Sequence, residues 1–415
     1  MIKAQKGTKD ILPQDSAKWQ FMEQKAIEIF EGANFGELRT PIFEATELFA
    51  RGVGDSTDIV NKEMYTFSIA DRSLTLRPEN TAGVVRAYIE NGMHRLSAPV
   101  KIWYKGPMFR YERPQAGRQR QFHQVGVEMF GIDSPAADAE VISLAINYLE
   151  AINIPNLSLE INSIGCPHCR ENYRNNLKTL VAPRLEEFCE DCKMRYEKNP
   201  LRILDCKNLT CAEILASEEF QKVINSEFIC DECIEHFDSV KKYLDALNIK
   251  YTINHQLVRG LDYYNRTVFE IKSNSIGSQS AVCGGGRYDG LVEMLGGPKT
   301  AGIGFAMGME RLFMLMQDAH EKNLDIFVVS NLTEEAMKMT QKLRKMGYIV
   351  DFDCSNKKFG KQLEKASKLK AKLALIIGED ELKNGVVTIK NMTTSEQKQI
   401  SLNGLNEDKI KQIFS

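Results

Sequence analysis

Two strand-like segments between residues 100 and 130 bring charged and amide side chains to one face of a hairpin. The alternation of polar and apolar residues predicts strands over Lys101–Glu112 and Gln121–Phe130. Because side chains alternate between the faces of a strand, Arg110 is expected on the same side as Gln124 and Glu128. A solvated sheet face would explain this alternation equally well.

The loop that joins these strands, residues 113–120, favours a ligand over a solvated face. It contains no acid and three arginines, Arg113, Arg118 and Arg120. Such a cluster suits phosphate groups or a nucleic-acid backbone. On the second strand, Gly126 is expected to leave room for a ligand between its polar neighbours.

A further arginine stands near the start of a helix predicted over Gly308–Gln317. Arg311 there opposes the helix dipole, which makes sense if an anionic ligand binds nearby. Glu310 could instead offset its charge. The chain lacks the pattern GxxxxGK[ST], so a P-loop is excluded and nucleotide phosphates would need another arrangement.

A short polar stretch precedes the helix predicted over Ala82–Asn91. Asn80 or Thr81 can cap this helix. Capping does not account for Glu79, which could pair with an ammonium group.

Paired tyrosines follow a cation in the segment Arg259–Glu270. Tyr263 and Tyr264 offer ring faces and hydroxyl groups to a small aromatic ligand. Three successive glycines, residues 284–286, let a ligand approach the backbone closely. A tight turn would explain these glycines as well.

Eight of the ten cysteines fall within one stretch, at Cys166, Cys169, Cys189, Cys192, Cys206, Cys211, Cys230 and Cys233. Six of them form CxxC pairs, and eight thiols suffice for two tetrahedral zinc sites. The polar N-terminus has no apolar core of a secretory signal, which favours metal binding or free thiols over disulfides. The sequence therefore predicts one or two structural zinc ions, without fixing which cysteines share an ion.

The elements that position these residues fall into regions of different composition. Residues 1–165 and 248–322 mix strand and helix patterns, 166–247 is helical and cysteine-rich, and 323–415 alternates short strands with helices. A chain of 415 residues is too long for a single core. We therefore expect two or three domains.

Charge and hydropathy narrow the class of protein further. A net charge of −2 excludes a uniformly basic protein, so any nucleic-acid contact must be local. The segment Lys357–Lys372 carries seven lysines and one acid, Glu364, which fits either RNA or a solvated helix face. No apolar run approaches the roughly 20 residues that span a bilayer.

Together these segments resemble the histidyl members of the class II aminoacyl-tRNA synthetases. The resemblance covers essentially the whole chain, with Gly106–Gln115 and Arg120–Glu128 similar to motif 2, Gly304–Leu312 to motif 3 and Arg39–Glu44 to the dimer-forming motif 1. Two histidine-specific signatures match Arg259–Glu270 and Gly284–Leu291. Asn80 departs from the family, which more often has glycine there.

The resemblance implies an α+β chain with a class II catalytic domain built on an antiparallel sheet, over 1–165 and 248–322. It implies a mostly helical insertion domain over 166–247 and a C-terminal α/β anticodon-binding domain over 323–415. The implied protein is a cytoplasmic homodimer without membrane contact, which activates L-histidine with ATP and Mg²⁺ and transfers it to the 3′ end of tRNA(His). The family does not as a rule require zinc.

Roles for individual residues follow from the same resemblance. Three arginines are expected to be catalytic at the reacting phosphates: Arg110, Arg259 and Arg311. ATP is expected to contact Arg110, Glu112, Arg118 and Arg311. Histidine is expected to contact Glu79, Thr81, Arg110, Gln124, Glu128, Arg259, Tyr263, Tyr264 and Tyr288. The tRNA is expected to contact Arg113, Arg118, Arg120, Lys357, Lys358 and Lys361.

Two other functions fit parts of the sequence. A synthetase-like regulatory subunit of histidine biosynthesis would bind histidine without charging tRNA. Such relatives usually lose parts of the histidine signatures and the C-terminal domain, and this chain retains both. An RNA-binding protein without catalysis would leave Arg259, Arg311 and the glycine-rich segment unexplained.

Overall fold

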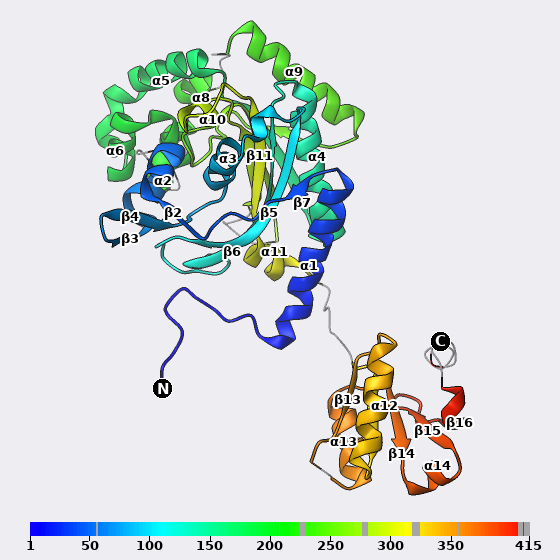
Figure 1. Cartoon of the computed structure of the whole chain (residues 1–415). Coiled ribbons are helices and arrows are strands. Elements are labelled where there is room, and N and C mark those ends of the chain that lie inside the picture. Colours follow the sequence, from blue (N-terminus) through cyan, green and yellow to red (C-terminus); the bar gives the residue numbers. More distant parts are fainter. Residues whose placement is uncertain are drawn as a thin grey trace. The chain divides into compact units, whose positions relative to one another are not determined.

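An eight-stranded sheet contains the predicted hairpin (Figure 1). It lies in the first of two compact units of the computed structural model, Met1–Ala319, and the second unit is His320–Ser415. The structure describes residues 1–54, 57–206, 208–224, 229–275, 281–317, 324–355, 357–405 and 410. In spatial order the strands are β1 (Gly36–Glu37), β5 (Val100–Phe109), β6 (Gln121–Phe130), β11 (Gly302–Gly308), β10 (Ala281–Arg287), β9 (Asn265–Ser273), β7 (Leu157–Ser163) and β8 (Thr252–Ile253).

The strands of this sheet run antiparallel except at its two edges, where β1 pairs with β5 and β7 with β8 in parallel. One face is apolar and covered by helices. Val125 and Val127 of β6 point to it and are buried. They share a core with α1 (Pro13–Gly32), α4 (Pro135–Ala151) and α9 (Asp231–Ala246). The polar residues that alternate with them therefore face the other side.

Helix α1 buries a stripe at helical spacing, formed by Trp19, Met22, Ala26 and Phe30. Leu12 occupies its N-cap position. Asp15 and Ser16 lie inside the first turn, because Pro13 already supplies the first helical residue.

The polar side of the large sheet borders a second core. This core contains side chains of α3 (Thr81–Glu90) and α10 (Leu291–Met294), together with Tyr104 and Met108 of β5. Two further short helices belong to this unit, α2 (Thr46–Val53) and α11 (Met309–Leu315). None of the helices in the described residues is long and apolar enough to cross a membrane.

Three short strands form a separate sheet in the order β2 (Phe43–Ala45), β4 (Arg72–Leu76) and β3 (Tyr65–Ile69). Residues paired directly across strands point to the same face. The register therefore places Arg72, paired with Ile69 at one end, and seven mostly apolar side chains on one face: Phe43, Ala45, Tyr65, Phe67, Ile69, Leu74 and Leu76. Phe43 is 53% exposed and Ile69 61% exposed.

The segment 166–247 is helical, as predicted, with α5 (Pro167–Val181), α6 (Glu190–Lys198), α7 (Leu209–Leu215), α8 (Glu218–Ile224) and α9. Helix α9 packs on α4, and its Phe237 and Leu244 belong to the core under the large sheet. The segment therefore ends inside the core of the first unit. Its division from the catalytic part as a separate domain remains a prediction.

The second unit is a small α/β fold. Its five strands lie in the order β13 (Val350–Phe352), β12 (Ile326–Ser330), β14 (Leu373–Ile377), β15 (Val386–Asn391) and β16 (Gln397–Ser401). Helices α12 (Thr333–Lys345) and α13 (Phe359–Lys368) cover opposite faces of β12, since α12 packs with Val328 and α13 with Val329. A short helix, α14 (Glu379–Lys383), precedes β15.

Candidate active site

Three arginines from distant parts of the sequence line one cavity of about 410 Å³. Arg110 follows strand β5, Arg259 lies in the loop before β9, and Arg311 belongs to helix α11. Their convergence is the arrangement that the sequence prediction required. It concentrates positive charge in a hollow that can receive phosphate groups.

The floor of this cavity is the polar face of the large sheet. Glu128 of β6 pairs with Gly304 of β11. Ala306, two residues along, pairs with Gly126 on one side and Gly284 on the other. A Cβ on Gly304 would lie 1.9 Å from a carboxyl oxygen of Glu128, so only glycine fits beside this acid. These small residues leave room for side chains that line the cavity, Glu128 beside Gly304 and Arg259 beside Gly284.

Glu128 is a buried acid in this floor. Thr81 donates a hydrogen bond from its Oγ1 to Oε1 of Glu128 at 2.7 Å, and the hydroxyl of Tyr288 donates to Oε2. Burial raises the pKa of Glu128 to about 8, and the nearby Glu79 acts in the same direction. Glu128 is therefore mostly protonated at neutral pH in the free protein.

Aromatic rings and an amide complete the pocket around Glu128. The ring centroids of Tyr263 and Tyr264 are 4.7 Å apart, and those of Tyr263 and Tyr288 are 5.6 Å apart. Among the described residues, no group donates a hydrogen bond to the buried Oε1 of Gln124, which lines the cavity. A buried acid, tyrosine rings and an unused acceptor suit a small aromatic ligand that carries N–H groups.

Glu79 caps helix α3, in place of Asn80 or Thr81. Its carboxyl group accepts hydrogen bonds from the backbone N of Thr81 at 2.8 Å and of Ala82 at 2.9 Å. Asn80 instead accepts from Oγ1 of Thr40 at 2.6 Å, so it ties the helix start to motif 1. Asn80 occupies the N-cap position, one of the two predicted, but its side chain does not cap, because the carboxyl group of Glu79 already accepts from the N–H groups of the first turn. Glu79 still lines the cavity and retains acceptor capacity for an ammonium group.

Arg259 is fixed by an ion pair between its Nη1 and Oε2 of Glu270, at 2.7 Å. Its buried Nε contacts no acceptor among the described residues. Gly284 accommodates the guanidinium, because a Cβ there would lie 1.7 Å from Nη2. The guanidinium of Arg259 is thus held in place, and its Nε–H can donate to a ligand.

Arg311 lies among other cations. Its Nη1 donates to the carbonyl oxygen of Ala281 at 2.6 Å. Burial lowers the pKa of Arg311, and repulsion from Arg118 and Arg110 lowers it further, while Glu112 and Glu270 act in the opposite direction. The arginines at this end of the cavity lie close enough to act together on an anionic ligand.

Comparisons with known proteins agree with this geometry. The family model described as histidyl-tRNA synthetase matches residues 7–312, and that of an anticodon binding domain matches 322–412. The histidine–tRNA ligase of Pelotomaculum thermopropionicum is 48% identical over 96% of this chain and 95% of its own. That of Desulforamulus reducens is 49% identical over 96% and 97%. The crystal structure of apo S. aureus histidyl-tRNA synthetase is 39% identical, with a TM-score of 0.81 over 100% of both chains.

The chain belongs to the histidyl-tRNA synthetase family. It is an aminoacyl-tRNA ligase with the class II fold, and histidine is its amino acid. The regulatory-subunit alternative is not favoured. A structure from Bacillus halodurans described as an ATP phosphoribosyltransferase regulatory subunit/histidyl-tRNA synthetase is 21% identical at a TM-score of 0.66, which shows only the shared fold.

The structure of this synthetase gathers most of the predicted site residues. The cavity is lined by Glu79, Thr81, Arg110, Glu112, Arg118, Gln124, Glu128, Arg259, Tyr263, Tyr264, Tyr288 and Arg311. Arg113 is exposed and does not line it. Arg120 lies outside as well, with its guanidinium 3.8 Å from the ring centroid of Tyr111. The individual roles remain predictions.

Strand alternation does not place Arg110 or Glu112, contrary to the sequence expectation. Strand β5 ends at Phe109, and both residues lie in the loop. The loop is closed by a hydrogen bond from the backbone N of Arg110 to the carbonyl oxygen of Arg120 at 2.9 Å. Arg110 is oriented instead by its Nε, which donates to the carbonyl oxygen of Pro78 at 2.8 Å.

The glycines make room for the protein itself. A Cβ on Gly126 would lie 2.6 Å from the hydroxyl oxygen of Tyr104, so this ring fills the space that we expected a ligand to use. Gly285 and Gly286 likewise face backbone carbonyl oxygens at 2.4 Å and 2.6 Å. These positions allow close packing of strands β9, β10 and β11, an effect that a single sequence does not distinguish from ligand binding.

Glu310 does not offset Arg311. Its carboxyl group accepts hydrogen bonds from the backbone N of His123 at 3.0 Å and 2.9 Å, and it lies 2.9 Å from Nδ1 of the same residue. The acid therefore joins helix α11 to strand β6.

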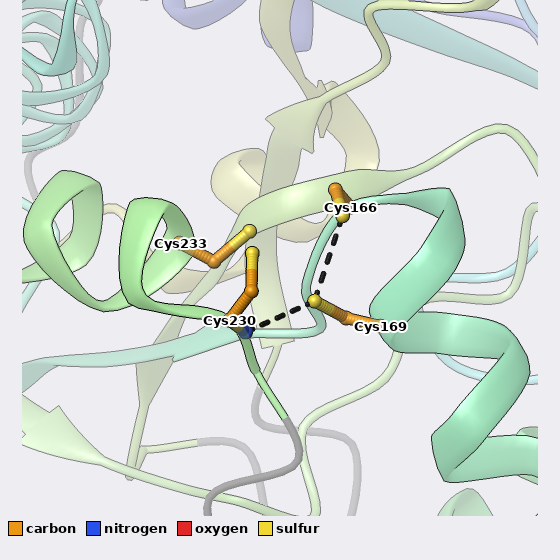
Figure 2. Close-up of side chains that lie close together, drawn as sticks. All are labelled: Cys166, Cys169, Cys230 and Cys233. Carbon is orange, nitrogen blue, oxygen red and sulfur yellow. Dashed lines mark hydrogen bonds between the residues drawn. The ribbon is translucent and has the colours of Figure 1, made fainter.

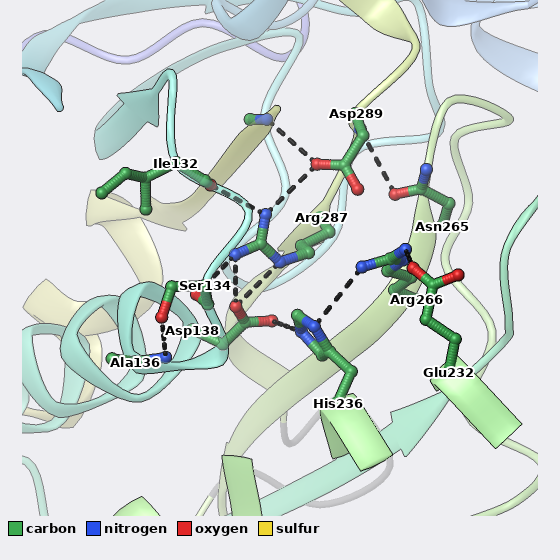
Figure 3. A network of polar contacts seen from close by, with 11 residues as sticks. Ile132, Ser134, Ala136, Asp138, Glu232, His236, Asn265, Arg266, Arg287 and Asp289 are labelled. Atoms are coloured by element: carbon green, nitrogen blue, oxygen red, sulfur yellow. Dashed lines mark hydrogen bonds and ion pairs between the residues drawn. The ribbon is translucent and has the colours of Figure 1, made fainter. Parts of the chain in front are cut away.

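Sequence reasoning missed a buried charge network behind the pocket (Figure 3). Arg287 is fully buried and forms an ion pair with Asp138 at 2.6 Å, while its Nη1 lies 3.2 Å from Asp289. His236 of helix α9 contacts the other oxygen of Asp138 at 3.3 Å. Because Arg287 directly precedes Tyr288, this network holds the tyrosine that contacts Glu128. The place of Arg287 within the second histidine signature was the available signal.

The predicted tRNA-binding lysines lie in the second unit. Lys357, Lys358 and Lys361 are exposed at the start of helix α13. The surface is less basic than the sequence suggested, because Asp353 lies 3.5 Å from Lys365 and Asp325 lies 2.9 Å from Lys372. These acids flank strands β13 and β12, at Asp353 after β13 and Asp325 before β12, so the local lysine count did not include them.

Proposed function

We propose that the 410 Å³ cavity is the site where L-histidine and ATP form histidyl-adenylate and diphosphate. In this step a histidine carboxylate oxygen attacks the α-phosphorus and diphosphate leaves. Two anions must meet, so fixed positive charge at the reacting atoms lowers the barrier. The observation that carries the proposal is the convergence of Arg110, Arg259 and Arg311 beside the buried Glu128.

The Glu128 end of the cavity would bind histidine. A ring N–H of the imidazole donates to Glu128 between the rings of Tyr264 and Tyr288. The free acceptor of Gln124 and the carboxyl group of Glu79 receive the α-ammonium group. An apolar side chain of similar size would leave Glu128 without its partner, and unpaired buried polar groups are how such a pocket rejects analogues.

The arginine end would bind ATP. Arg259 and Arg110 lie beside the α-phosphate, where they stabilise charge as the phosphorus is attacked. Arg311 and Arg118 hold the outer phosphates. Mg²⁺ prefers oxygen ligands, which Glu112 offers in this cavity. When bound, it neutralises the departing diphosphate.

The second step would transfer histidine to tRNA(His). A ribose hydroxyl at the 3′ end attacks the adenylate carbonyl carbon and AMP leaves, so no further nucleophile is needed from the protein. The exposed arginines of the 113–120 loop would contact the acceptor end. The lysines of α13 would contact the RNA from the second unit. Charging of tRNA is expected in the cytoplasm.

A second copy of the chain would cover the apolar face of the β2–β4–β3 sheet. Motif 1, Arg39–Glu44, enters this sheet at β2. Phe43, Phe67 and Ile69 are exposed there at 53%, 38% and 61%. An apolar sheet face of this kind is unfavourable in water and marks an interface. We therefore propose a homodimer through this face.

The test is a substrate screen with the purified full-length protein. ATP–pyrophosphate exchange is measured with each amino acid in turn, followed by aminoacylation of total tRNA. L-Histidine alone is expected to support both reactions. Exchange supported by another amino acid, or charging without histidine dependence, would overturn the proposal.

A further inference from the structure

The eight cysteines of the segment 166–247 gather into two groups of four. The outer cysteine site contains Cys166, Cys169, Cys230 and Cys233, and the inner cysteine site contains Cys189, Cys192, Cys206 and Cys211. Within each group the sulfur atoms all lie within 4.8 Å of one another. Figure 2 shows the four side chains of the outer site turned toward a common centre. Along the chain, the four cysteines of the inner site lie between the two CxxC pairs of the outer site. The CxxC spacing alone did not predict this grouping.

The sulfur–sulfur distances fit a single tetrahedral ion. Zn–S bonds of about 2.3 Å place the corners of a tetrahedron about 3.8 Å apart. Sγ of Cys166 lies 3.5 Å from Sγ of Cys169, and Sγ of Cys189 lies 3.7 Å from Sγ of Cys206. None of the ten cysteines forms a disulfide.

Local structure prepares these sulfurs for a cation. Three of the cysteines, Cys166, Cys189 and Cys230, occupy N-cap positions of helices α5, α6 and α9, whose positive ends favour thiolates. Backbone N–H groups also donate to sulfur, from Cys230 to Cys169 at 3.1 Å and from Cys189 to Cys211 at 3.3 Å. Such contacts orient metal ligands in the way that outer hydrogen bonds commonly do.

Gly165, next to the outer site, allows the backbone to turn close to Cys169. Gly165 has φ +71°, and a Cβ there would lie 2.4 Å from Cβ of Cys169. Glycine therefore allows the chain to turn from strand β7 directly into the CxxC pair.

From these observations we infer that the chain binds two structural zinc ions, one in each cysteine site. Four soft thiolates in tetrahedral arrangement select zinc or iron. An iron–sulfur cluster distributes its cysteines over several irons and would spread the sulfurs farther apart than one ion does. The close spacing therefore favours a single ion in each site, and four cysteines around one ion are characteristic of structural zinc.

The outer site also supports the histidine pocket, a step of the inference that rests on the proposed function. Arg170 directly follows Cys169. Its Nη1 donates to the carbonyl oxygens of Asp262 at 3.1 Å and Tyr264 at 2.6 Å. The loop held in this way carries Tyr263 and Tyr264 to the cavity. Arg170 is thus a positioning residue, and the zinc ion fixes the turn from which it reaches.

Metal analysis of the reduced, full-length protein tests the zinc sites without reference to activity. We expect about two zinc ions per chain, about one in Cys233→Ser or Cys192→Ser, and about two in the control Cys354→Ser, whose exposed thiol lies outside both sites. Cobalt substitution is expected to give the visible absorption of tetrahedral thiolate sites. Fewer than about 0.2 zinc ions per wild-type chain, or iron with sulfide in their place, would overturn the inference.

Steady-state kinetics tests the link to the pocket. Arg170→Gln is expected to keep about two zinc ions and to raise the KM for histidine roughly tenfold, with a smaller change in kcat. Arg174→Gln, one turn along the same helix, is the matched control and is expected to leave KM unchanged. An unchanged KM in Arg170→Gln would refute its positioning role. A wild-type protein that contains no zinc but activates histidine normally would refute the zinc sites. The proposed function would then still stand.

Discussion

Arg259 and Glu270 form an ion pair of 2.7 Å that joins the histidine-signature loop to strand β9 at the edge of the cavity. Burial disfavours the charge on Arg259, but Tyr264 and Glu270 outweigh it and raise the pKa of the arginine. The guanidinium is therefore charged and fixed before any substrate binds, which is the condition for electrostatic stabilisation of a transition state.

Replacing Arg259 with glutamine is expected to lower kcat for histidine-dependent ATP–pyrophosphate exchange by roughly 100- to 1,000-fold, the usual effect of losing one such donor. Glu270→Gln leaves the cation in place but loosens it, so a smaller loss is expected. The exposed Arg51→Gln is a control for the general loss of an arginine. Thermal unfolding by circular dichroism shows whether the variants fold. A folded Arg259→Gln protein with unchanged exchange would exclude the role given to this residue.

Histidine binding is expected to depend on pH through Glu128. The complex needs one proton shared by Glu128 and the imidazole. Below about pH 8 free Glu128 carries that proton, and above about pH 6.5 free imidazole lacks it. Affinity is therefore expected to be highest between these values and to fall above pH 8, where a proton must be taken up. Calorimetric titration across pH 6 to 9 measures it, and a monotonic rise above pH 8 would contradict the account.

Glu128→Gln is expected to abolish histidine activation and to change how the stability of the folded protein depends on pH. The pKa of Glu128 is raised in the folded protein above the unfolded value of 4.5. The folded state therefore binds the extra proton, and stability is lost as the pH rises from about 4.5 to 8. The variant lacks this penalty, so its Tm relative to wild type is expected to increase over that range while histidine activation is lost. A constant Tm difference between pH 5 and 8 would argue against the raised pKa.

The ion pair of Asp138 and Arg287 is expected to stabilise the first unit and the pocket behind it. Both side chains are fully buried. Removing either partner, as in Asp138→Asn or Arg287→Met, leaves a buried charge without its counter-ion and is expected to cost about 3–5 kcal/mol of unfolding free energy. The double variant Asp138→Leu/Arg287→Met is expected to recover part of this loss. Urea unfolding measures the free energy of unfolding of each variant. Additive losses in the double variant would show that the two charges act independently.

The lysines of α13 are expected to contribute to tRNA affinity without affecting adenylate formation. Changing Lys357, Lys358 and Lys361 to glutamine removes cations that would release counterions from the RNA. The slope of log K against log salt is expected to become less steep by about 0.7 for each phosphate that the variant no longer neutralises. Lys338, Lys342 and Lys345 on α12, over the opposite face of β12, provide the matched control. Equal effects of the two triple variants would mean that binding is not specific to α13.

Dimerisation is expected to depend on Phe43. A charge at this position would have to be buried in the proposed interface, which is strongly unfavourable. Phe43→Glu is therefore expected to shift sedimentation from dimer to monomer, while Leu209→Glu, at an apolar residue 81% exposed on α7, is expected to leave it unchanged. A wild-type protein that sediments as a monomer would refute the proposed interface.

Local patterns predicted the elements of the site better than their contacts. Period-two alternation correctly placed Gln124 and Glu128 on one face of β6, because a buried sheet face imposes that period on the sequence. It also placed Arg110 on the side of Gln124 and Glu128, whose cavity it lines, but it wrongly extended strand β5 to include this residue, since the end of a strand depends on the loop closure with Arg120. The partners of Arg287 were not predictable, because Asp138 is distant in sequence and no local period encodes such a pair.

The cysteines illustrate the same limit. CxxC spacing identifies pairs that share a helix start, since such pairs are local. Whether Cys166 shares a group with Cys189 or with Cys230 depends on how the intervening helices fold back. The structure resolves this into nested groups.

A crystal structure with L-histidine and a non-hydrolysable ATP analogue tests the central proposal most directly. The account predicts the imidazole beside Glu128, the α-phosphate beside Arg259 and the γ-phosphate beside Arg311. Density for the imidazole away from Glu128, or for the triphosphate outside the reach of these arginines, would contradict it.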